Sequence, residues 1–286
     1  MKLKSVIKRE PFEGCIASFE DAKIILIGSG YDGTSSYRPG SRFAPIAIRS
    51  EALYSQENYS PYFKKDLTEK AIHDAGDIDL PFGDKGKVLE MIYQTTQHFF
   101  SQKKKVCVIG GEHLISLPVV QSAIKTYPDL RVIQIDAHLD LMDDLFGDRI
   151  SHGTVMRRIS ELKNKNKWIY QVGIRSGSKE EYDFAKKNNH LFQFNLKDFF
   201  KAIRGIQDYP VYLSLDLDVF DPSLIPGTGT PEAGGIMFPE FIDFLNVLNG
   251  ANIIGCDMVE LSPKIDTSGN STIHAAKILR ELLMIL

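Results

Sequence analysis

Short runs of β-forming residues alternate with amphipathic stretches along this chain, and this alternation constrains the fold more strongly than any other feature. Such a pattern is typical of βαβ units, in which helices connect parallel strands and cover the sheet. It predicts eight strands, at residues 23–28, 71–78, 105–110, 130–135, 168–174, 191–195, 211–217 and 252–259. It predicts helices at residues 45–55, 84–101, 115–127, 153–162, 178–188, 239–248 and 272–286.

The 286 residues contain no internal repeat, low-complexity tract or Pro- and Ser-rich linker that would mark a boundary between domains. Chains of this length with an α/β pattern often form one domain. We therefore predict a single doubly wound α/β domain with a mainly parallel sheet, spanning residues 1–286.

Charge and cysteine content exclude several classes of protein. With 34 basic and 37 acidic residues the formal net charge is −3, so no broad basic surface for nucleic acid is expected. Cys15, Cys107 and Cys256 are widely separated and form no CxxC pair, which argues against a disulfide framework or a thiolate zinc site. No segment approaches the roughly 18 apolar residues of a membrane span, and the basic N-terminus lacks the apolar run of a secretory signal. We expect a cytoplasmic protein with no membrane or nucleic-acid partner.

Four of the predicted strands end in polar residues that are costly to dehydrate. In open parallel sheets, ligands bind beyond the carboxyl ends of the strands, so residues that are remote in sequence can share one site there. Residues at i, i+2 and i+4 of a strand also point to the same side. The polar residues are His113 in "VCVIGGEH", Asp136, His138 and Asp140 in "VIQIDAHLD", Asp216 and Asp218 in "VYLSLDLDVFDP", and Asp257 and Glu260 in "IIGCDMVELSP".

Four aspartates gathered at one place would repel one another, and some would take up protons unless a positive charge compensated them. Two divalent cations would balance the four charges. Carboxylates with imidazole and no thiolate suit manganese or magnesium better than structural zinc. Because paired cations lower the pKa of water, hydrolysis is the predicted class of reaction. Glu260, on a separate strand, could accept two parallel hydrogen bonds from a guanidinium, whereas Asp221 before Pro222 is typical of a turn.

These motifs resemble those of the arginase and agmatinase family of manganese ureohydrolases. The resemblance extends over most of the chain, through "GYDGTSSYRPGSRFAPIAIR", "GGEH", "DAHLD", "SHGTVMRR", "SLDLDVFDPSLIPGTGTPEAGG" and "DMVELSP". It implies a three-layer α/β/α domain with an eight-stranded parallel sheet, which agrees with the strands predicted above. It also implies a homo-oligomer, a trimer or a hexamer.

The resemblance further implies a role for individual residues. One manganese would be held by His113, Asp136, Asp140 and Asp216, and the other by His138, Asp136, Asp216 and Asp218. His152 matches the mobile histidine that transfers protons and contacts substrate, and Asp140 matches the carboxylate that relays a proton to the leaving amine. Glu260 matches the residue that orients the guanidinium, with Asp257 and Thr230 at supporting positions. One departure is Glu112 in "GGEH", where the commoner pattern has Asp. Because the ligand is the following His113, the extra methylene bears on the hydrogen bonds around the site rather than on the number of metals.

The expected reaction releases urea and a primary amine from a guanidino substrate. Relatives that use arginine recognise its α-carboxylate through a loop rich in Asn and hydroxyl groups, whereas the same loop here, "LMDDLFGDRISHG", contains Asp143, Asp144 and Asp148. This acidic loop favours agmatine, which ends in an ammonium group and would yield putrescine. Alternatively the aspartates form a solvated turn, and arginine, guanidinobutyrate or an aminopropyl-agmatine is the substrate.

Three other functions compete with this hypothesis. Gly28, Gly30 and Gly33 have the GxGxxG spacing of a dinucleotide-binding turn, but Pro39 and Gly40 interrupt the helix that such a turn requires. A deacetylase-like zinc hydrolase would need one metal and fewer ligands. A non-catalytic binding member of the family would be expected to have lost ligands, yet all six positions are filled.

Overall fold

The core of the molecule is a twisted sheet, described here for residues 5–163 and 167–286 of a computed structural model. Its strands are β1 (Val6–Ile7), β2 (Ile24–Ser29), β5 (Ile72–Ile78), β6 (Lys105–Gly110), β7 (Arg131–Ile135), β8 (Ile169–Ile174), β9 (His190–Gln193), β10 (Val211–Asp216) and β11 (Ile253–Val259). Across the sheet they lie in the order β1-β5-β2-β6-β11-β10-β7-β8-β9. All pairings are parallel except that of β1 with β5.

The eight predicted strands are confirmed, with small shifts at their ends. The structure adds β1, which pairs antiparallel to β5 with Val6 opposite Ile78, so the sheet has nine strands among the described residues. It also adds a separate hairpin of β3 (Tyr59–Ser60) and β4 (Lys65–Asp66). Each of these added strands has two residues, which is too short for an alternating pattern to appear in the sequence.

The helices are α1 (Ala44–Ser55), α2 (Lys85–Ser101), α3 (Ser116–Thr126), α4 (Val155–Ser160), α5 (Lys179–Asn188), α6 (Lys197–Ala202), α7 (Phe238–Leu248) and α8 (Asn270–Ile285). The sequence did not predict α6, because its six residues make fewer than two turns and show no helical period. The helix predicted at 153–162 is shorter than expected, since His152–Thr154 forms a 3-10 turn before α4 begins.

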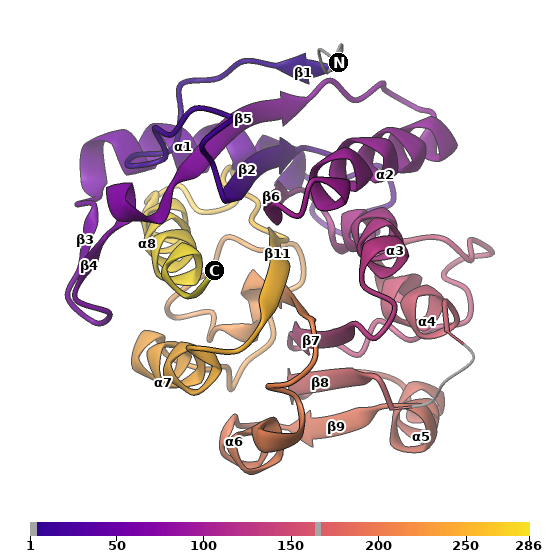
Figure 1. Ribbon diagram of the computed structural model, residues 1–286. Coiled ribbons are helices and arrows are strands. Elements are labelled where there is room, and N and C mark those ends of the chain that lie inside the picture. The colour runs from indigo at the N-terminus through magenta and orange to yellow at the C-terminus, as the bar shows by residue number, and fades with distance from the viewer. Residues whose placement is uncertain (1–4, 164–166) are drawn as a thin grey trace.

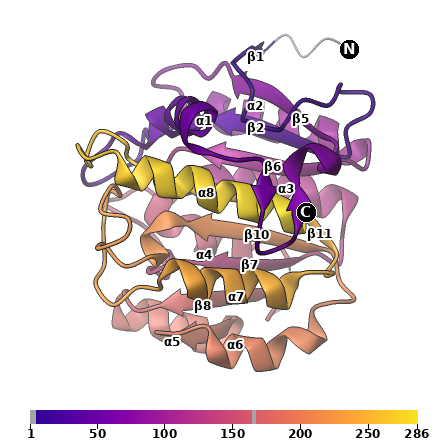
Figure 2. The same cartoon turned by 90° about the vertical axis from the view of Figure 1, so that its left-hand side faces the viewer.

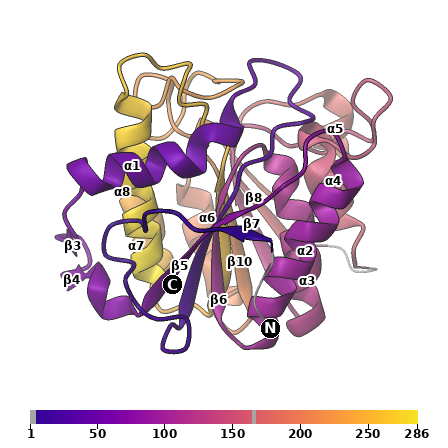
Figure 3. The same cartoon turned by 90° about the horizontal axis from the view of Figure 1, so that it is seen from above.

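Helices cover both faces of the sheet and make the fold a single three-layer α/β/α domain, as predicted (Figure 1). Figure 2 shows α1, α8, α7 and α6 side by side over one face, and the end-on view in Figure 3 places α2, α3, α4 and α5 on the other. Each face packs a hydrophobic core of its own. The central strands β7, β10 and β11 are consequently buried at every residue, which explains their nearly continuous apolar sequence.

The sheet order places the polar strand ends next to one another. Strands β6, β11, β10 and β7 are the four whose ends bear the predicted site residues, and they are consecutive in the sheet. Because they are all parallel, their carboxyl ends lie along one edge. The sequence predicted that all four polar segments lie at the carboxyl ends of strands, but it did not indicate which strands are neighbours in the sheet.

The glycine motif after β2 does not open a helix. The chain continues as a loop to the 3-10 turn Ser41–Phe43, and α1 begins only at Ala44. Gly30 instead allows close packing of the loop, since a Cβ there would lie 2.5 Å from the carbonyl oxygen of Arg42. The described residues therefore lack the helix N-terminus that would bind a pyrophosphate. None of the helices in this part of the chain is both long and apolar enough to cross a membrane.

Candidate metal centre

The structure brings together all six side chains that were predicted as ligands. His113 begins the 3-10 turn after β6, Asp136, His138 and Asp140 follow β7, Asp216 ends β10, and Asp218 lies in the next turn. Five of them form two groups that share Asp136 and could each hold a metal ion, and Asp216 lies 3.4 Å from His113 of the first group.

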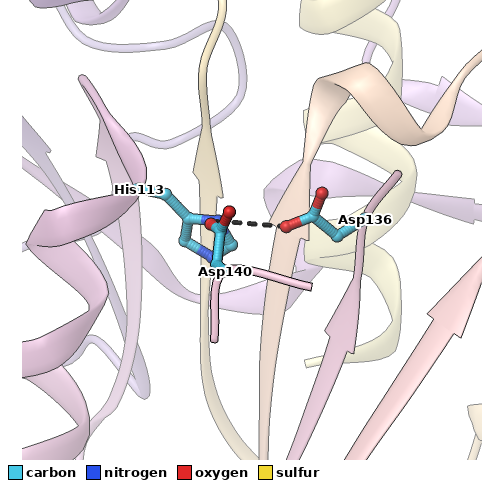
Figure 4. A group of neighbouring side chains, drawn as sticks. All are labelled: His113, Asp136 and Asp140. Atoms are coloured by element: carbon cyan, nitrogen blue, oxygen red, sulfur yellow. Dashed lines mark ion pairs between the residues drawn. The ribbon is translucent and has the colours of Figure 1, made fainter. Parts of the chain in front are cut away.

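The first group surrounds the Nδ1 atom of His113 (Figure 4). Its distances to carboxylate oxygens are 3.2 Å for Asp136, 3.0 Å for Asp140 and 3.4 Å for Asp216. Although Nδ1 is buried, it has no partner with the geometry of a hydrogen bond. Three oxygens and a nitrogen that converge without bonding to one another are the arrangement expected of ligands around a cation.

The second group contains His138 and Asp218. The Nδ1 atom of His138 lies 2.8 Å from Oδ2 of Asp218 and 3.7 Å from Oδ1 of Asp136. Backbone amides orient these carboxylates, because the amide of His138 donates to Asp136 and that of Ala137 donates to Asp218. Residues directly after β7 thus orient the oxygens of both carboxylates.

The electrostatics of the cluster call for an external positive charge. Among the described residues, no Lys or Arg side chain forms an ion pair with Asp136, Asp140, Asp216 or Asp218. Burial, together with the neighbouring Asp218, raises the pKa of Asp136 to about 7, and the same causes raise the pKa of Asp216 well above its ordinary value. The residues therefore fit divalent cations that prefer oxygen and imidazole ligands.

A second layer of side chains holds the imidazole of His113. Its Nε2 atom lies 2.9 Å from the hydroxyl of Ser214, which donates to Asp257 at 2.7 Å. Tyr212 donates to the other oxygen of Asp257, also at 2.7 Å. Asp257 is thus fully buried one step behind a ligand, in keeping with its predicted supporting position, and it fixes the orientation of the ring.

A chain of buried amides supports Asp136. Gln134 donates to Asp136 at 2.6 Å, Gln171 donates to Gln134 at 2.7 Å, and Asn189 donates to Gln171 at 2.9 Å. These side chains extend from β7 across β8 to the residue before β9. The chain thus leads from the interior of the sheet to the carboxylate shared by both ligand groups.

Glu260 lies directly after β11 in a left-handed backbone conformation, with φ of 67°. Its Oε1 atom accepts the backbone N–H of His113 at 2.7 Å, and its own N–H donates to Gly111. Burial is the main cause that raises the pKa of Glu260 to about 8, and the nearby Glu112 adds to it. Left-handed residues other than glycine cost about 1–3 kcal/mol and cluster at functional sites. Asp140 has the same conformation, with φ of 52°.

His152 begins the 3-10 turn before α4. Its backbone N–H donates to Thr34 at 3.1 Å, and its Nε2 atom lies 3.2 Å from the hydroxyl of Ser36. Burial lowers the pKa of its imidazole, so the ring is neutral at pH 7. The predicted proton-transfer residue therefore contacts the loop after β2, which the sequence motif alone did not indicate.

Within the described residues, neither Thr230 nor Asp221 belongs to a ligand group. Thr230 is exposed and makes no hydrogen bond within the described residues. Asp221 closes a turn, as predicted, because its oxygens accept from Ser223, Gly234 and Gly235.

The acidic loop is partly compensated by basic side chains. Asp143 pairs with Arg149 and Arg158, and Asp148 pairs with Lys85. Asp144 accepts the backbone N–H of Gly147 and has no ion pair within the described residues. The loop is therefore less negative than its three aspartates suggest.

Comparison with known proteins agrees with this geometry. The model of the arginase family matches residues 22–285. The chain belongs to the arginase family. A relative named agmatinase, from Bacillus cereus, is 41% identical over 271 residues, which cover 93% of both chains. An agmatinase from Bacillus subtilis is 42% identical over 270 residues, 93% of this chain and 92% of its own length. The structure of the agmatine ureohydrolase of Thermoplasma volcanium matches with a TM-score of 0.86 at 30% identity, and covers 99% of this chain and 96% of that one.

Membership of the arginase family identifies the protein as an amidino hydrolase. It leaves no support for a dinucleotide-binding function, and it disfavours the deacetylase-like and non-catalytic alternatives, since both ligand groups are complete.

Sequence reasoning missed the residues that support the ligands. Ser214 lies two positions before Asp216 on β10, and Gln134 of β7 lies two positions before Asp136, the residue after that strand, to which it donates a hydrogen bond. A buried polar residue two positions before a ligand was the signal available for both. Thr34 and Ser36 had no comparable signal, because their partner His152 is remote in sequence.

Proposed function

We propose that this chain is a ureohydrolase that uses two manganese ions to hydrolyse agmatine to urea and putrescine. One observation carries the proposal: two groups of aspartate and histidine ligands share Asp136, and the buried Nδ1 of His113 lacks a hydrogen-bond partner. Carboxylate oxygens with imidazole nitrogens are donors that suit manganese. The names of the relatives from the two Bacillus species support agmatine as the substrate.

Six residues would hold the two ions, with Asp136 and Asp216 shared between them. The first ion would bind His113, Asp136, Asp140 and Asp216, and the second His138, Asp136, Asp216 and Asp218. When bound, such ions lower the pKa of water and stabilise the negative charge that develops during attack on the guanidino carbon.

Glu260 is the residue that we expect to bind the guanidinium group. Its carboxylate can accept two parallel hydrogen bonds from this planar cation. Although burial raises the pKa of Glu260 to about 8, an adjacent cation favours the charged form. Because Oε1 also accepts the N–H of His113, the guanidinium would be held in a fixed position relative to a ligand.

Two residues of the chain would manage protons. The leaving amine has to gain a proton before the C–N bond breaks. Asp140, whose carboxylate lies among the ligands, would accept a proton from the attacking water and deliver it to that nitrogen. His152, neutral at pH 7, would exchange a proton between the product amine and solvent. Water and agmatine are thereby converted to urea and putrescine with no further reactant.

The acidic loop supports agmatine less strongly than the sequence suggested, because basic side chains pair with Asp143 and Asp148. Of its three aspartates, Asp144 is the one without an ion pair within the described residues, and it remains the candidate for attracting an ammonium group. Arginine, guanidinobutyrate and aminopropyl-agmatine keep the guanidino end and differ at the other, so Glu260 does not distinguish among them.

A urea-release assay with metal analysis tests the proposal. The purified protein is loaded with manganese, its metal content is measured, and urea is quantified with agmatine, arginine, guanidinobutyrate and aminopropyl-agmatine. We expect two ions per chain and the highest kcat/KM with agmatine. A higher kcat/KM with another guanidino compound would reassign the substrate, and one zinc ion per chain would contradict the paired site.

The family resemblance also leads us to propose that the protein is a cytoplasmic homo-oligomer, a trimer or a hexamer. Light scattering during gel filtration gives the mass in solution, to be compared with the 32.2 kDa of one chain. A mass of one chain at micromolar concentration would contradict this assembly.

A further inference from the structure

The turn between β6 and the 3-10 helix at His113 joins three parts of the candidate site. His113 is a ligand, and its N–H donates to Glu260. The carbonyl of Gly111 accepts the N–H of Glu260. Between them, Glu112 contacts the loop after β2, through its N–H and through its side chain. The turn therefore links a ligand, the guanidinium residue and a third element.

Glu112 is fully buried, and both of its carboxylate oxygens are engaged. Oε1 accepts the hydroxyl of Thr34 at 2.6 Å. Oε2 accepts the backbone N–H of Thr34 at 2.9 Å and the hydroxyl of Ser35 at 3.1 Å. The backbone N–H of Glu112 also donates to Tyr31 at 2.7 Å. A single residue thus holds Tyr31, Thr34 and Ser35 of the loop, and no basic side chain of the described residues pairs with its carboxylate.

The same loop contacts His152. Thr34 donates its hydroxyl proton to Glu112, which leaves the oxygen free to accept the N–H of His152 at 3.1 Å. Two residues further on, the hydroxyl of Ser36 lies 3.2 Å from Nε2 of His152. The backbone and the ring of His152 are thus each placed by a hydroxyl of a loop that Glu112 anchors.

The length of the side chain at position 112 matters to this arrangement. Aspartate would withdraw the carboxylate by one C–C bond, about 1.5 Å. Hydrogen bonds of 2.6 and 2.9 Å would then exceed ordinary lengths unless the loop moved by a similar distance. The backbone has little room for such a shift, because a Cβ on Gly111 would lie 2.0 Å from the carbonyl oxygen of Tyr31.

We propose that Glu112 is a positioning residue, which sets the place of His152 through the hydroxyl of Thr34. Position 112 has glutamate where the commoner pattern has aspartate, and the longer side chain is needed here to reach Thr34 in the loop at 31–36. This inference rests on the proposed role of His152 in proton transfer. Within the described residues, the side chain of Glu112 hydrogen-bonds to Thr34 and Ser35 and to none of the candidate metal ligands.

Hydrogen exchange tests the placement without reference to activity. In the manganese-loaded protein, exchange at the amide of His152 is compared for the parent, Glu112→Asp and Thr34→Val. We expect exchange to rise at least about tenfold in both variants, because each removes or displaces the acceptor of this N–H. Thr34→Ser keeps the hydroxyl and should exchange like the parent. Unchanged exchange in Glu112→Asp would overturn the proposal even if no guanidino substrate had been found.

Kinetics test the consequence. Glu112→Asp and Thr34→Val should each lower kcat by about 10- to 100-fold with the metal content unchanged. Thr34→Ser, which keeps the hydroxyl, should have a kcat close to that of the parent. In a His152→Ala background, Glu112→Asp should lower kcat less than twofold further, because the residue it positions is gone. An equal loss in both backgrounds would overturn the proposal and assign Glu112 to the support of His113. If Glu112→Asp does not fold, the same cycle with Thr34→Val decides the question.

Discussion

Two clusters of buried carboxylates lie in the same sheet, and only one of them contains a guanidinium. On β5, Asp74 and Asp77 both pair with Arg49 of α1, at 2.7 and 2.6 Å. Arg49 also donates to the carbonyls of Pro45 and Gly76, and Arg9 pairs with Asp77. At the ends of β7 and β10, the carboxylates of four aspartates lie beside two histidines and form no ion pair with a lysine or arginine of the described residues.

This difference separates a structural cluster from a binding site. Around Arg49 every donor has an acceptor within the chain, so burial of the charges is compensated on folding. Around Asp136 the compensation is incomplete, the pKa of the carboxylate rises to about 7, and the buried Nδ1 of His113 has no hydrogen bond. The first cluster should matter to stability alone, and the second to metal binding and turnover.

The largest effect should follow from removing the shared ligand. Asp136→Asn takes away a carboxylate from both ligand groups, and we expect loss of bound metal with urea release lowered by about 10³–10⁴-fold. Metal analysis and the urea assay measure both quantities. Asp77→Asn is the matched control in the other cluster and should keep the metal and turnover of the parent. Unchanged turnover in Asp136→Asn would contradict the assignment of the site.

The next effect concerns stability and belongs to the Arg49 cluster. Arg49→Met leaves Asp74 buried without its partner, which should lower the free energy of unfolding by about 3 kcal/mol. This is the lower end of the usual range for a broken buried pair, because Arg9 still pairs with Asp77.

Urea unfolding of the metal-free protein measures this loss. The double variant Arg49→Met, Asp74→Asn should recover part of it, since it removes the uncompensated charge as well. A loss below about 1 kcal/mol in Arg49→Met would mean that the cluster is not structural.

The sequence distinguished the second cluster but not the first. His113, Asp136, Asp140, Asp216 and Asp218 lie in short motifs at strand ends, which was enough to predict one shared site. The reason given from strand periodicity was wrong for Asp136 and Asp140, because both follow β7 and Asp140 is left-handed, so the turn after the strand brings them together. Arg49, Asp74 and Asp77 showed no pattern, because an ion pair between a helix and a strand leaves no periodic signal.

The fold, like the site, was predictable from the sequence only in part. Long buried strands and amphipathic helices were found, since their patterns extend over many residues. Strand β1, helix α6 and the order of the strands were not, because they depend on tertiary packing. For the same reason the partners of His152 appeared only in the structure.

Metal binding should stabilise the fold through one cluster and not the other. At a free manganese concentration 100 times the dissociation constant, the gain in unfolding free energy should be about 2.7 kcal/mol for the parent. Asp77→Asn should show the same gain from its own baseline, and Asp136→Asn should show little. Thermal unfolding with and without manganese measures the difference. An equal gain in Asp136→Asn would mean that the ion binds elsewhere.

The smallest effect should come from an aspartate that lies close to a ligand in the sequence but is compensated by hydrogen bonds. Asp221 accepts from Ser223, Gly234 and Gly235, and these bonds, that to the Ser223 side chain first, lower its pKa to about 2. Because the folded pKa lies below the unfolded value, the charged form stabilises the protein above about pH 4, and this contribution disappears as the pH falls through about 2.

Asp221→Asn should therefore cost about 0.5–1.5 kcal/mol at pH 7 and progressively less as the pH falls toward about 2, where half of the parent aspartate is protonated. Urea unfolding at several pH values measures this difference. Metal content and urea release should match the parent, since Asp221 lies three residues after Asp218 yet turns its oxygens to backbone and hydroxyl donors. A loss of metal in Asp221→Asn would show that compensation by hydrogen bonds does not separate a structural carboxylate from a ligand in this segment.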